Sequence, residues 1–114
     1  MYRYKVKSVK RVIDGDTVDL EIDLGFNIVI TQRVRLKGIN APETRTLDLA
    51  EKALGNKAKT WLTEQLGTFS SLIIETTRED KYGRVLGVLY KDNETISMNE
   101  LMLKEGLVVS YMVD

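Results

Sequence analysis

The chain has 114 residues, of which 43% are hydrophobic, and its 17 basic and 17 acidic side chains leave it without net charge. This length is enough to bury the core of one domain, which we place over residues 1–114. Cysteine and histidine are absent, which excludes disulfides, thiolate chemistry and imidazole ligands. Any bound metal must therefore be held by oxygen atoms, as calcium and magnesium are. The neutral balance argues against a nucleic-acid binder that depends on a positive overall field.

No apolar run in the sequence approaches the roughly 20 residues of a membrane span. Residues 1–10 are basic and alternate between polar and apolar types, so they lack the apolar centre of a signal peptide. We therefore predict no membrane association and a cytoplasmic location for the chain as given, although removal of a leader would be compatible with secretion. The sequence leaves the oligomeric state open.

Alternating apolar residues predict three strands in the first third of the chain. The spacing of two slips to three at Ser8, which indicates a bulge in a long first strand. Asp14-Gly15-Asp16 and Gly25 mark the turns. The predicted strands cover residues 2–13, 17–24 and 27–36.

The rest of the chain predicts a helix, two strands and a second helix. Asp48 with Glu51 has the spacing of a capping box, and Gly67 is a plausible stop. A second capping box runs from Ser97 to Glu100. The predicted segments are a helix over 48–67 with Leu54, Ala58, Trp61, Leu62 and Gln65 at helical spacing, strands over 72–76 and 84–90, a helix ending before Gly106, and an extended segment over 107–111. This order predicts a mainly β, α+β fold: a five-stranded Greek-key OB-fold barrel with two helices, the first closing its bottom.

Two aspartates flank a glycine at the junction of the first two strands, in Asp14-Gly15-Asp16-Thr17. Asp-Gly pairs are frequent in ordinary turns, and for the motif alone that interpretation is favoured. Aspartate oxygens on a tight turn can also converge on a hard cation such as calcium.

Arg33 and Arg35 are one residue apart and therefore share a face of the third strand. Arg33 is expected on a solvated face. An arginine on the inner side of a barrel, near a carboxylate turn, would be costly unless an anion or an acidic group paired it.

The segment Asn40-Ala41-Pro42-Glu43 contains the single proline of the chain. Proline fixes its own backbone and favours extended geometry at Ala41, which can hold the Ala41 carbonyl and the Glu43 carboxylate in fixed directions. Taken alone, an ordinary loop is the favoured interpretation.

Basic groups and an aromatic ring surround a glycine in Asp80-Lys81-Tyr82-Gly83-Arg84. A charged hairpin turn is one interpretation. The other is a phosphate clamp, because a planar guanidinium can bind a phosphate with two hydrogen bonds.

Together and in this order, these motifs resemble the staphylococcal nuclease (thermonuclease) family over nearly the whole chain, from about Val9 to Tyr111. The DGDT and DKYGR motifs are specific in combination. The matching segments are residues 12–18, Arg35-Leu36, Pro42-Glu43, residues 80–84, Asn99-Glu100-Leu101 and Gly106-Leu107.

The resemblance implies a calcium-dependent phosphodiesterase that cuts DNA or RNA and leaves 3′-phosphate ends. It makes Arg35 and Arg84 the groups that bind the scissile phosphate, and Glu43 the group that positions or deprotonates the attacking water. It implies a metal site formed by Asp16, by Asn40, by the Ala41 carbonyl and, through water, by Asp14. Lys81 and Tyr82 match residues that contact a neighbouring phosphate, and Tyr111 falls near the base-stacking tyrosines of the family.

The sequence departs from the family pattern at three points. Asn40 stands where a second aspartate is usual, so we predict weaker calcium affinity and a changed metal preference. The family's third helix has no counterpart, which predicts lower stability or a covering partner. The neutral charge predicts weaker salt-dependent binding of long DNA than in basic relatives.

Two other functions compete with an active endonuclease. One is a catalytically weak or inactive module that keeps the fold and binds nucleic acid, and the other is a small OB domain that binds a protein. Asn40 favours such a loss of activity. Retention of Asp16, Arg35, Glu43 and Arg84 together favours the enzyme, which we expect at about three to one over the binding module.

Overall fold

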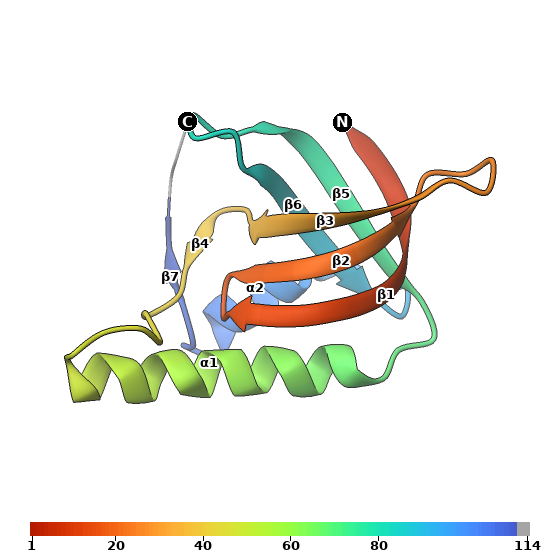
Figure 1. The fold of residues 1–114 in the computed structure, drawn as a ribbon. Helices are drawn as coiled ribbons and strands as arrows, with labels where there is room; N and C mark the ends of the chain where they lie inside the picture. Colours follow the sequence, from red (N-terminus) through yellow and green to blue (C-terminus); the bar gives the residue numbers. More distant parts are fainter. Residues whose placement is uncertain (112–114) are drawn as a thin grey trace.

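The computed structural model describes residues 1–111, except for the side chain of Arg78. Its main body is a closed barrel in which the strands follow the order β1-β2-β3-β6-β5 (Figure 1). Neighbouring strands are antiparallel except β3 and β6, which are parallel. The prediction of a five-stranded OB-type barrel with two helices is confirmed. The barrel strands are β1 Tyr2–Asp14, β2 Thr17–Asp23, β3 Val29–Leu36, β5 Leu72–Glu79 and β6 Val85–Lys91.

The barrel interior is filled by side chains from alternate positions of the strands, as the period-two pattern predicted. In β2, Val18, Leu20 and Ile22 are buried, whereas the residues between them are half-exposed. The long β1 pairs with β2 along most of its length and with β5 at its start. Its register shifts between Val6 and Ser8, which confirms the bulge predicted there. Such bulges increase the local twist and let one long strand curve around a small barrel.

Helix α1, Leu49–Gly67, lies across one end of the barrel (Figure 1). Asp48 caps it as predicted, because its carboxylate accepts the backbone N–H groups of Ala50 and Glu51. The predicted face is confirmed at Ala58 and Leu62, which are buried, and Trp61 packs half-buried against the core. It is wrong at Leu54, which is 57% exposed. Gly55 and Leu66 complete the buried face. The apolar pattern favoured Leu54 over the neighbouring glycine, but the glycine is what lets the helix approach closely.

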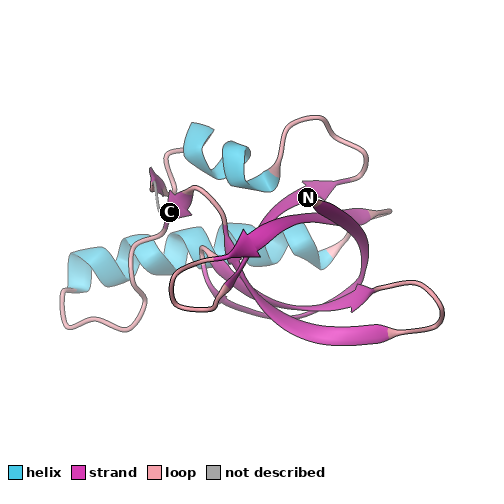
Figure 2. Cartoon of the chain, turned by 90° about the horizontal axis from the view of Figure 1, so that it is seen from above, coloured by secondary structure: helices cyan, strands magenta, loops and turns pink. Residues whose placement is uncertain are grey.

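Helix α2, Met98–Lys104, covers the barrel on another side, as the view from above shows (Figure 2). Ser97 caps it by accepting the N–H of Glu100. The buried Asn99 side chain accepts the N–H of Leu89 and donates to the carbonyls of Lys37 and Gly87. These three bonds fix the helix to the place where β3 ends and β6 continues.

A two-stranded antiparallel sheet lies outside the barrel. The extended segment predicted over 107–111 contains one of its strands, but the pairing was not predicted. It pairs β4, Ile39–Asn40, with β7, Val109–Ser110. The bond from the Tyr111 N–H to the Gly38 carbonyl, 2.8 Å long, continues the pairing. This small sheet brings the end of the chain beside Asn40.

No described helix is long and apolar enough to cross a membrane.

Candidate active site

A cavity of about 250 Å³ opens at one end of the barrel, where the β1–β2 turn meets the end of β3 and the loop that follows β4. It collects most of the predicted site residues from segments far apart in sequence. Of the predicted set, Lys81 and Tyr82 are outside its lining. The lining residues are Asp14, Asp16, Thr17, Arg35, Asn40, Ala41, Pro42, Glu43, Arg84 and Tyr111.

Asp16 is buried in the β1–β2 turn and holds the cavity wall together. One carboxylate oxygen accepts the backbone N–H of Ala41 at 2.8 Å, and the other accepts the Thr17 hydroxyl at 2.9 Å. The Asp16 backbone carbonyl accepts the N–H of Leu36 at 2.7 Å. A buried carboxylate needs such donors because burial removes its water. The DGDT segment thus forms a wall of the cavity as well as a turn.

Arg35 lies on the face of β3 opposite to the fully buried Val34 and Leu36, so it does not point into the barrel interior as an inner-side arginine would. It is nevertheless buried, with 9% of its side chain exposed. The covering comes from β4 and from Tyr111, whose ring centre lies 5.6 Å from the guanidinium carbon. Strand alternation alone could not reveal this cover, because it is built by the unpredicted sheet.

The Arg35 guanidinium is held from several sides. Its Nη1 donates to the carbonyls of Leu36 at 3.1 Å and Ile39 at 2.9 Å, and its Nη2 donates to the Asn40 amide oxygen at 3.2 Å. The same Nη1 lies 3.4 Å from a carboxylate oxygen of Asp16. The buried arginine therefore has the acidic partner that the sequence argument required, and its direction is fixed before any ligand arrives.

Arg33, by contrast, is exposed as predicted. It binds Asp19 on the neighbouring strand with two bonds, at 2.8 and 3.1 Å. The hydrogen bond from Arg33 lowers the pKa of the Asp19 carboxyl below its usual value, against a smaller opposing effect of burial. This pair is a solvated surface ion pair away from the cavity.

Arg84 reaches the cavity from the segment before β6. The fully buried Asp80 carboxylate accepts the N–H groups of Tyr82 and Arg84, each at 2.9 Å, and the Arg84 Nε at 2.6 Å. Burial favours a raised pKa for Asp80, but these bonds outweigh it and the pKa falls below its usual value. Residues 1–111 supply no hydrogen bond to the two terminal nitrogens of Arg84, which stay available to an anion.

Lys81 and Tyr82 lie next to Arg84 and outside the cavity. Tyr82 is 68% exposed, and its ring centre is 5.2 Å from both the Lys81 ammonium nitrogen and the Arg84 guanidinium carbon. The structure therefore brings these predicted residues to the rim of the site. A second hollow, of about 110 Å³, shares Arg35, Arg84 and Tyr111 with the cavity, so the charged surface continues from one hollow into the other.

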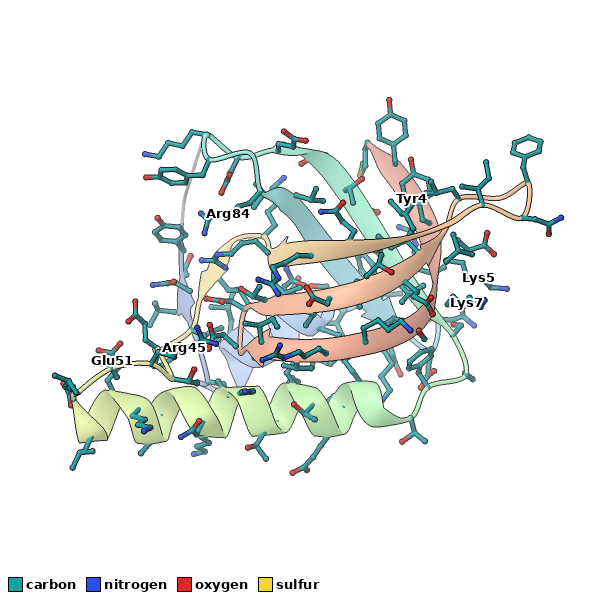
Figure 3. The ribbon with its side chains drawn as sticks, in the orientation of Figure 1. Tyr4, Lys5, Lys7, Arg45, Glu51 and Arg84 are labelled. Carbon is teal, nitrogen blue, oxygen red and sulfur yellow. The ribbon has the colours of Figure 1, made fainter. Side chains whose placement is uncertain are left out.

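The loop that carries Glu43 is anchored by residues that sequence reasoning missed. The Glu51 carboxylate accepts the backbone N–H of Glu43 at 3.1 Å, and the Thr44 hydroxyl donates to Asp14 at 2.6 Å. In a capping box the Glu51 side chain would accept the backbone N–H of Asp48. Here that N–H donates to the Thr46 hydroxyl instead. Figure 3 shows Glu51 at the start of α1, at the same end of the barrel as Arg84, while Lys5 and Lys7 lie at the opposite end.

Gly55 is the second missed anchor. A Cβ atom built there would lie 2.6 Å from the backbone oxygens of both Pro42 and Glu43, so the helix can touch the site loop only because this residue has no side chain. Gly15 shows the same close approach, with a built Cβ 2.7 Å from the Cβ of Ala58. A glycine inside a helix costs about 1 kcal/mol of stability relative to alanine. Its presence within the predicted helix was therefore the sign in the sequence that position 55 has a packing role.

The cavity fits a hard cation in the kind of atoms it offers. Its lining provides carboxylate, amide and carbonyl oxygens from Asp16, Asn40 and Ala41, and these are the ligand types that calcium and magnesium take. The charge density is modest, because the described residues contain no group of three or more acidic, histidine or cysteine side chains placed to share one ion. The Asn40 oxygen is also already bonded to Arg35.

The fold and this cavity define the class: small β-barrel proteins that bring carboxylates and guanidiniums from distant segments together in a hollow at one end. Residues 33–114 match the family model described as Staphylococcal nuclease homologue. The chain belongs to the staphylococcal nuclease family, as its motifs indicated.

Relatives that are named as nucleases support this assignment. The chain is 33% identical over 111 residues to the micrococcal nuclease of Shigella flexneri, covering 90% of this chain and 56% of that protein. It is 37% identical over 101 residues to the thermonuclease of Staphylococcus intermedius, covering 87% of this chain and 55% of that protein. It is 32% identical over 111 residues to the SPbeta prophage-derived endonuclease YokF of Bacillus subtilis, covering 94% of this chain and 35% of that protein. The chain thus spans about half or less of these relatives' length.

Proposed function

We propose that the chain is a metal-dependent endonuclease that hydrolyses phosphodiester bonds of DNA or RNA. The observation that carries the proposal is the single cavity that unites Arg35, Arg84, Asp16 and Glu43. Phosphodiester hydrolysis builds negative charge on the non-bridging oxygens, and fixed cationic groups stabilise that charge where it develops. Membership in a family that includes proteins named as nucleases supports the same reaction class.

The two arginines differ in a way that suits two tasks. Arg35 is held by four neighbours and can offer a fixed direction to the scissile phosphate. Arg84 is anchored through Nε alone and keeps its terminal nitrogens for the phosphate as charge builds. Glu43 is exposed on the loop, and no described donor bonds its carboxylate. It is therefore the group that can orient or deprotonate water.

Calcium is the proposed metal, held by Asp16, Asn40 and the Ala41 carbonyl, with Asp14 acting through water. A bound divalent cation would add Lewis-acid stabilisation of the phosphate and lower the pKa of water. The Thr44–Asp14 and Ala41–Asp16 bonds keep these oxygens on one side of the cavity. The proposed products carry 3′-phosphate ends, by similarity to the family.

The experiment that tests the proposal measures cleavage of single-stranded DNA, duplex DNA and RNA with calcium and then with a chelator. Glu43→Gln should lower the rate by about 10²–10⁴-fold, the range for loss of a general base. Glu64→Gln, an exposed residue on α1, is the matched control and should leave the rate unchanged. Cleavage that survives both the chelator and Glu43→Gln would come from a contaminant.

The second candidate is a binding module without turnover. Asn40 favours it, because its amide brings no charge to the metal site and its oxygen is bonded to Arg35. Folded protein that retains oligonucleotides but never cleaves them, at any calcium concentration, would select this alternative. For the active enzyme, Asn40→Asp should reach half-maximal cleavage at a lower calcium concentration. An unchanged calcium dependence would remove Asn40 from the metal site.

A further inference from the structure

The turn between β2 and β3 carries an aromatic residue in an unusual backbone conformation. The turn is closed by bonds from the N–H of Leu24 to the Ile28 carbonyl and from the N–H of Ile28 to the Gly25 carbonyl. Phe26 has φ 55° and is 96% exposed, and Asn27 has φ 62°. A positive φ suits glycine or asparagine and is strained for a bulky side chain. No packing within the described chain explains a phenylalanine at this position.

The strand that leaves this turn has one unpaired edge. β3 pairs with β2 from Val29 to Arg35, but its other neighbour, β6, pairs only with Val34 to Leu36. Within residues 1–111, the stretch 29–33 therefore leaves one side of its backbone without a partner strand. Figures 1 and 2 show this hairpin projecting from the barrel, at the end away from the β4–β7 sheet. Ile28, Val29 and Ile30 are 52%, 38% and 39% exposed beside it.

The unpaired stretch carries one charge, that of Arg33, which is bonded to Asp19, whereas the turn and the first four residues of β3 are uncharged. Residues 24–32 contain no acidic or basic side chain, in a chain in which 30% of residues are charged. Free edges in monomeric proteins are normally protected by lysine, proline or a bulge, and β3 has none of these between Val29 and Gln32. Two identical edges that are uncharged from Val29 to Gln32 can meet without repulsion.

We propose that this edge is the contact surface for a second copy of the chain. The two β3 edges pair antiparallel about a twofold axis near Ile30, so that the same patch serves both copies. The pairing satisfies open backbone groups and sets exposed apolar side chains of the two copies side by side, with Ile28 and Ile30 on one face of the joined sheet and Val29 on the other. Phe26, on the turn before the strand, lies against the partner copy. These few side chains fall short of the roughly 1,600 Å² of a standard interface, so the expected dimer is weak and reversible.

Sedimentation velocity of the whole chain, from about 1 µM to about 1 mM, measures this association directly. The wild-type protein should shift from monomer to dimer across the range. Val29→Lys places a charge on the edge and should raise the dimer dissociation constant at least about tenfold, with thermal melting used to check that the barrel is intact. Leu47→Lys is the matched control, because Leu47 is fully exposed on the loop before α1, and it should leave the dimer unchanged.

The absence of native cysteine allows the orientation to be tested separately. An antiparallel twofold arrangement brings the same residue of both copies together near the axis, so at least one of Val29→Cys, Ile30→Cys and Thr31→Cys should form a disulfide-linked dimer on oxidation. Thr60→Cys, exposed on α1, should not. A protein that stays monomeric at about 1 mM, a dimer indifferent to Val29→Lys, or failure of all three cysteines to cross-link would overturn the proposal. None of these results depends on nuclease activity.

Discussion

The two ends of the barrel differ in which side chains they bury and which they expose to solvent. At the cavity end, Asp16 and Arg35 are buried and paired: Asp16 accepts bonds from Ala41 and Thr17, and Arg35 donates to the carbonyls around it. At the hairpin end, Phe26 and Ile28 are apolar and face the solvent. Burying charge is costly unless it is fully paired, and exposing apolar surface forgoes the main stabilising force of folding.

Both ends therefore depart from what stability alone would select. The cavity end keeps its charges in a fixed arrangement before a ligand binds, which is what electrostatic stabilisation of a transition state requires. The hairpin end keeps a free edge that an additional strand can pair with. Substitutions should therefore lower the free energy of unfolding at the cavity end and raise it at the hairpin end. Four variants test this difference, from the largest expected effect to the smallest.

Arg35→Ala should lower the free energy of unfolding by about 3 kcal/mol or more, because it leaves the buried Asp16 carboxylate without its cation. Arg33→Ala removes an arginine from the same strand, but its pair with Asp19 is at the surface, so the loss should be much smaller. Urea denaturation of the two variants gives the difference. Equal losses for the two variants would mean that the cavity end gains nothing from its buried pair.

Gly55→Ala should lower the stability by about 1–3 kcal/mol, the cost of inserting a methyl group into a packed site. The clash falls on the Pro42 and Glu43 backbone, so cleavage should fall more than global stability explains. Gly67→Ala, in the same helix with nothing within 4 Å of the added Cβ, should instead gain a few tenths of a kcal/mol. Thermal melting and initial rates of both variants separate the two effects, and normal cleavage by Gly55→Ala would refute a role in positioning the loop.

Asp80→Asn tests the anchor of Arg84 through pH. The folded pKa of Asp80 is lowered, so its charge contributes stability that is complete above the ordinary aspartate pKa of about 4 and is lost as pH falls through the lower folded value. The stability gap between wild type and Asp80→Asn should therefore be widest near neutral pH and close under acidic conditions.

Asp92→Asn is the control for that experiment. The backbone N–H of Ser71, with further bonds from Ser70, lowers the pKa of Asp92, so its stability gap has the same direction with pH. Asp92 lies on the turn after β6, outside the cavity lining, and its replacement should leave cleavage unchanged. A cleavage loss shared by both variants would show that stability, and not the orientation of Arg84, limits the reaction.

Much of the fold was predictable because its signals are local. Alternation located the five barrel strands, and Asp48 and Ser97 marked the starts of both helices. The short β4 and β7 carry no pattern of their own, since two residues per strand show no alternation. Their pairing depends on a contact between residues about 70 positions apart, and sequence periodicity says nothing about such contacts.

The candidate site was likewise predictable only in part. Its chemical groups were predictable from motifs, because Asp16, Arg35, Glu43 and Arg84 each lie in a recognisable segment, and their meeting in one cavity agrees with that prediction. Their roles in cleavage remain predictions. The supports were not predictable: Glu51 bonds to a backbone N–H, and Gly55 acts by lacking a side chain. Such contacts depend on three-dimensional fit and leave only a weak trace in composition.

The smallest expected effect lies at the hairpin end and has the opposite sign. Phe26→Asn places a residue that tolerates positive φ where a bulky one is strained, so the monomer should gain about 0.5 kcal/mol. Leu47→Asn, at an equally exposed position without positive φ, should gain nothing. Denaturation at low protein concentration measures the monomer alone, while sedimentation at high concentration should show weaker association for Phe26→Asn. A variant that is both more stable and less associated would establish that Phe26 is kept for a contact between molecules, because a purely structural residue could not lose association while gaining stability.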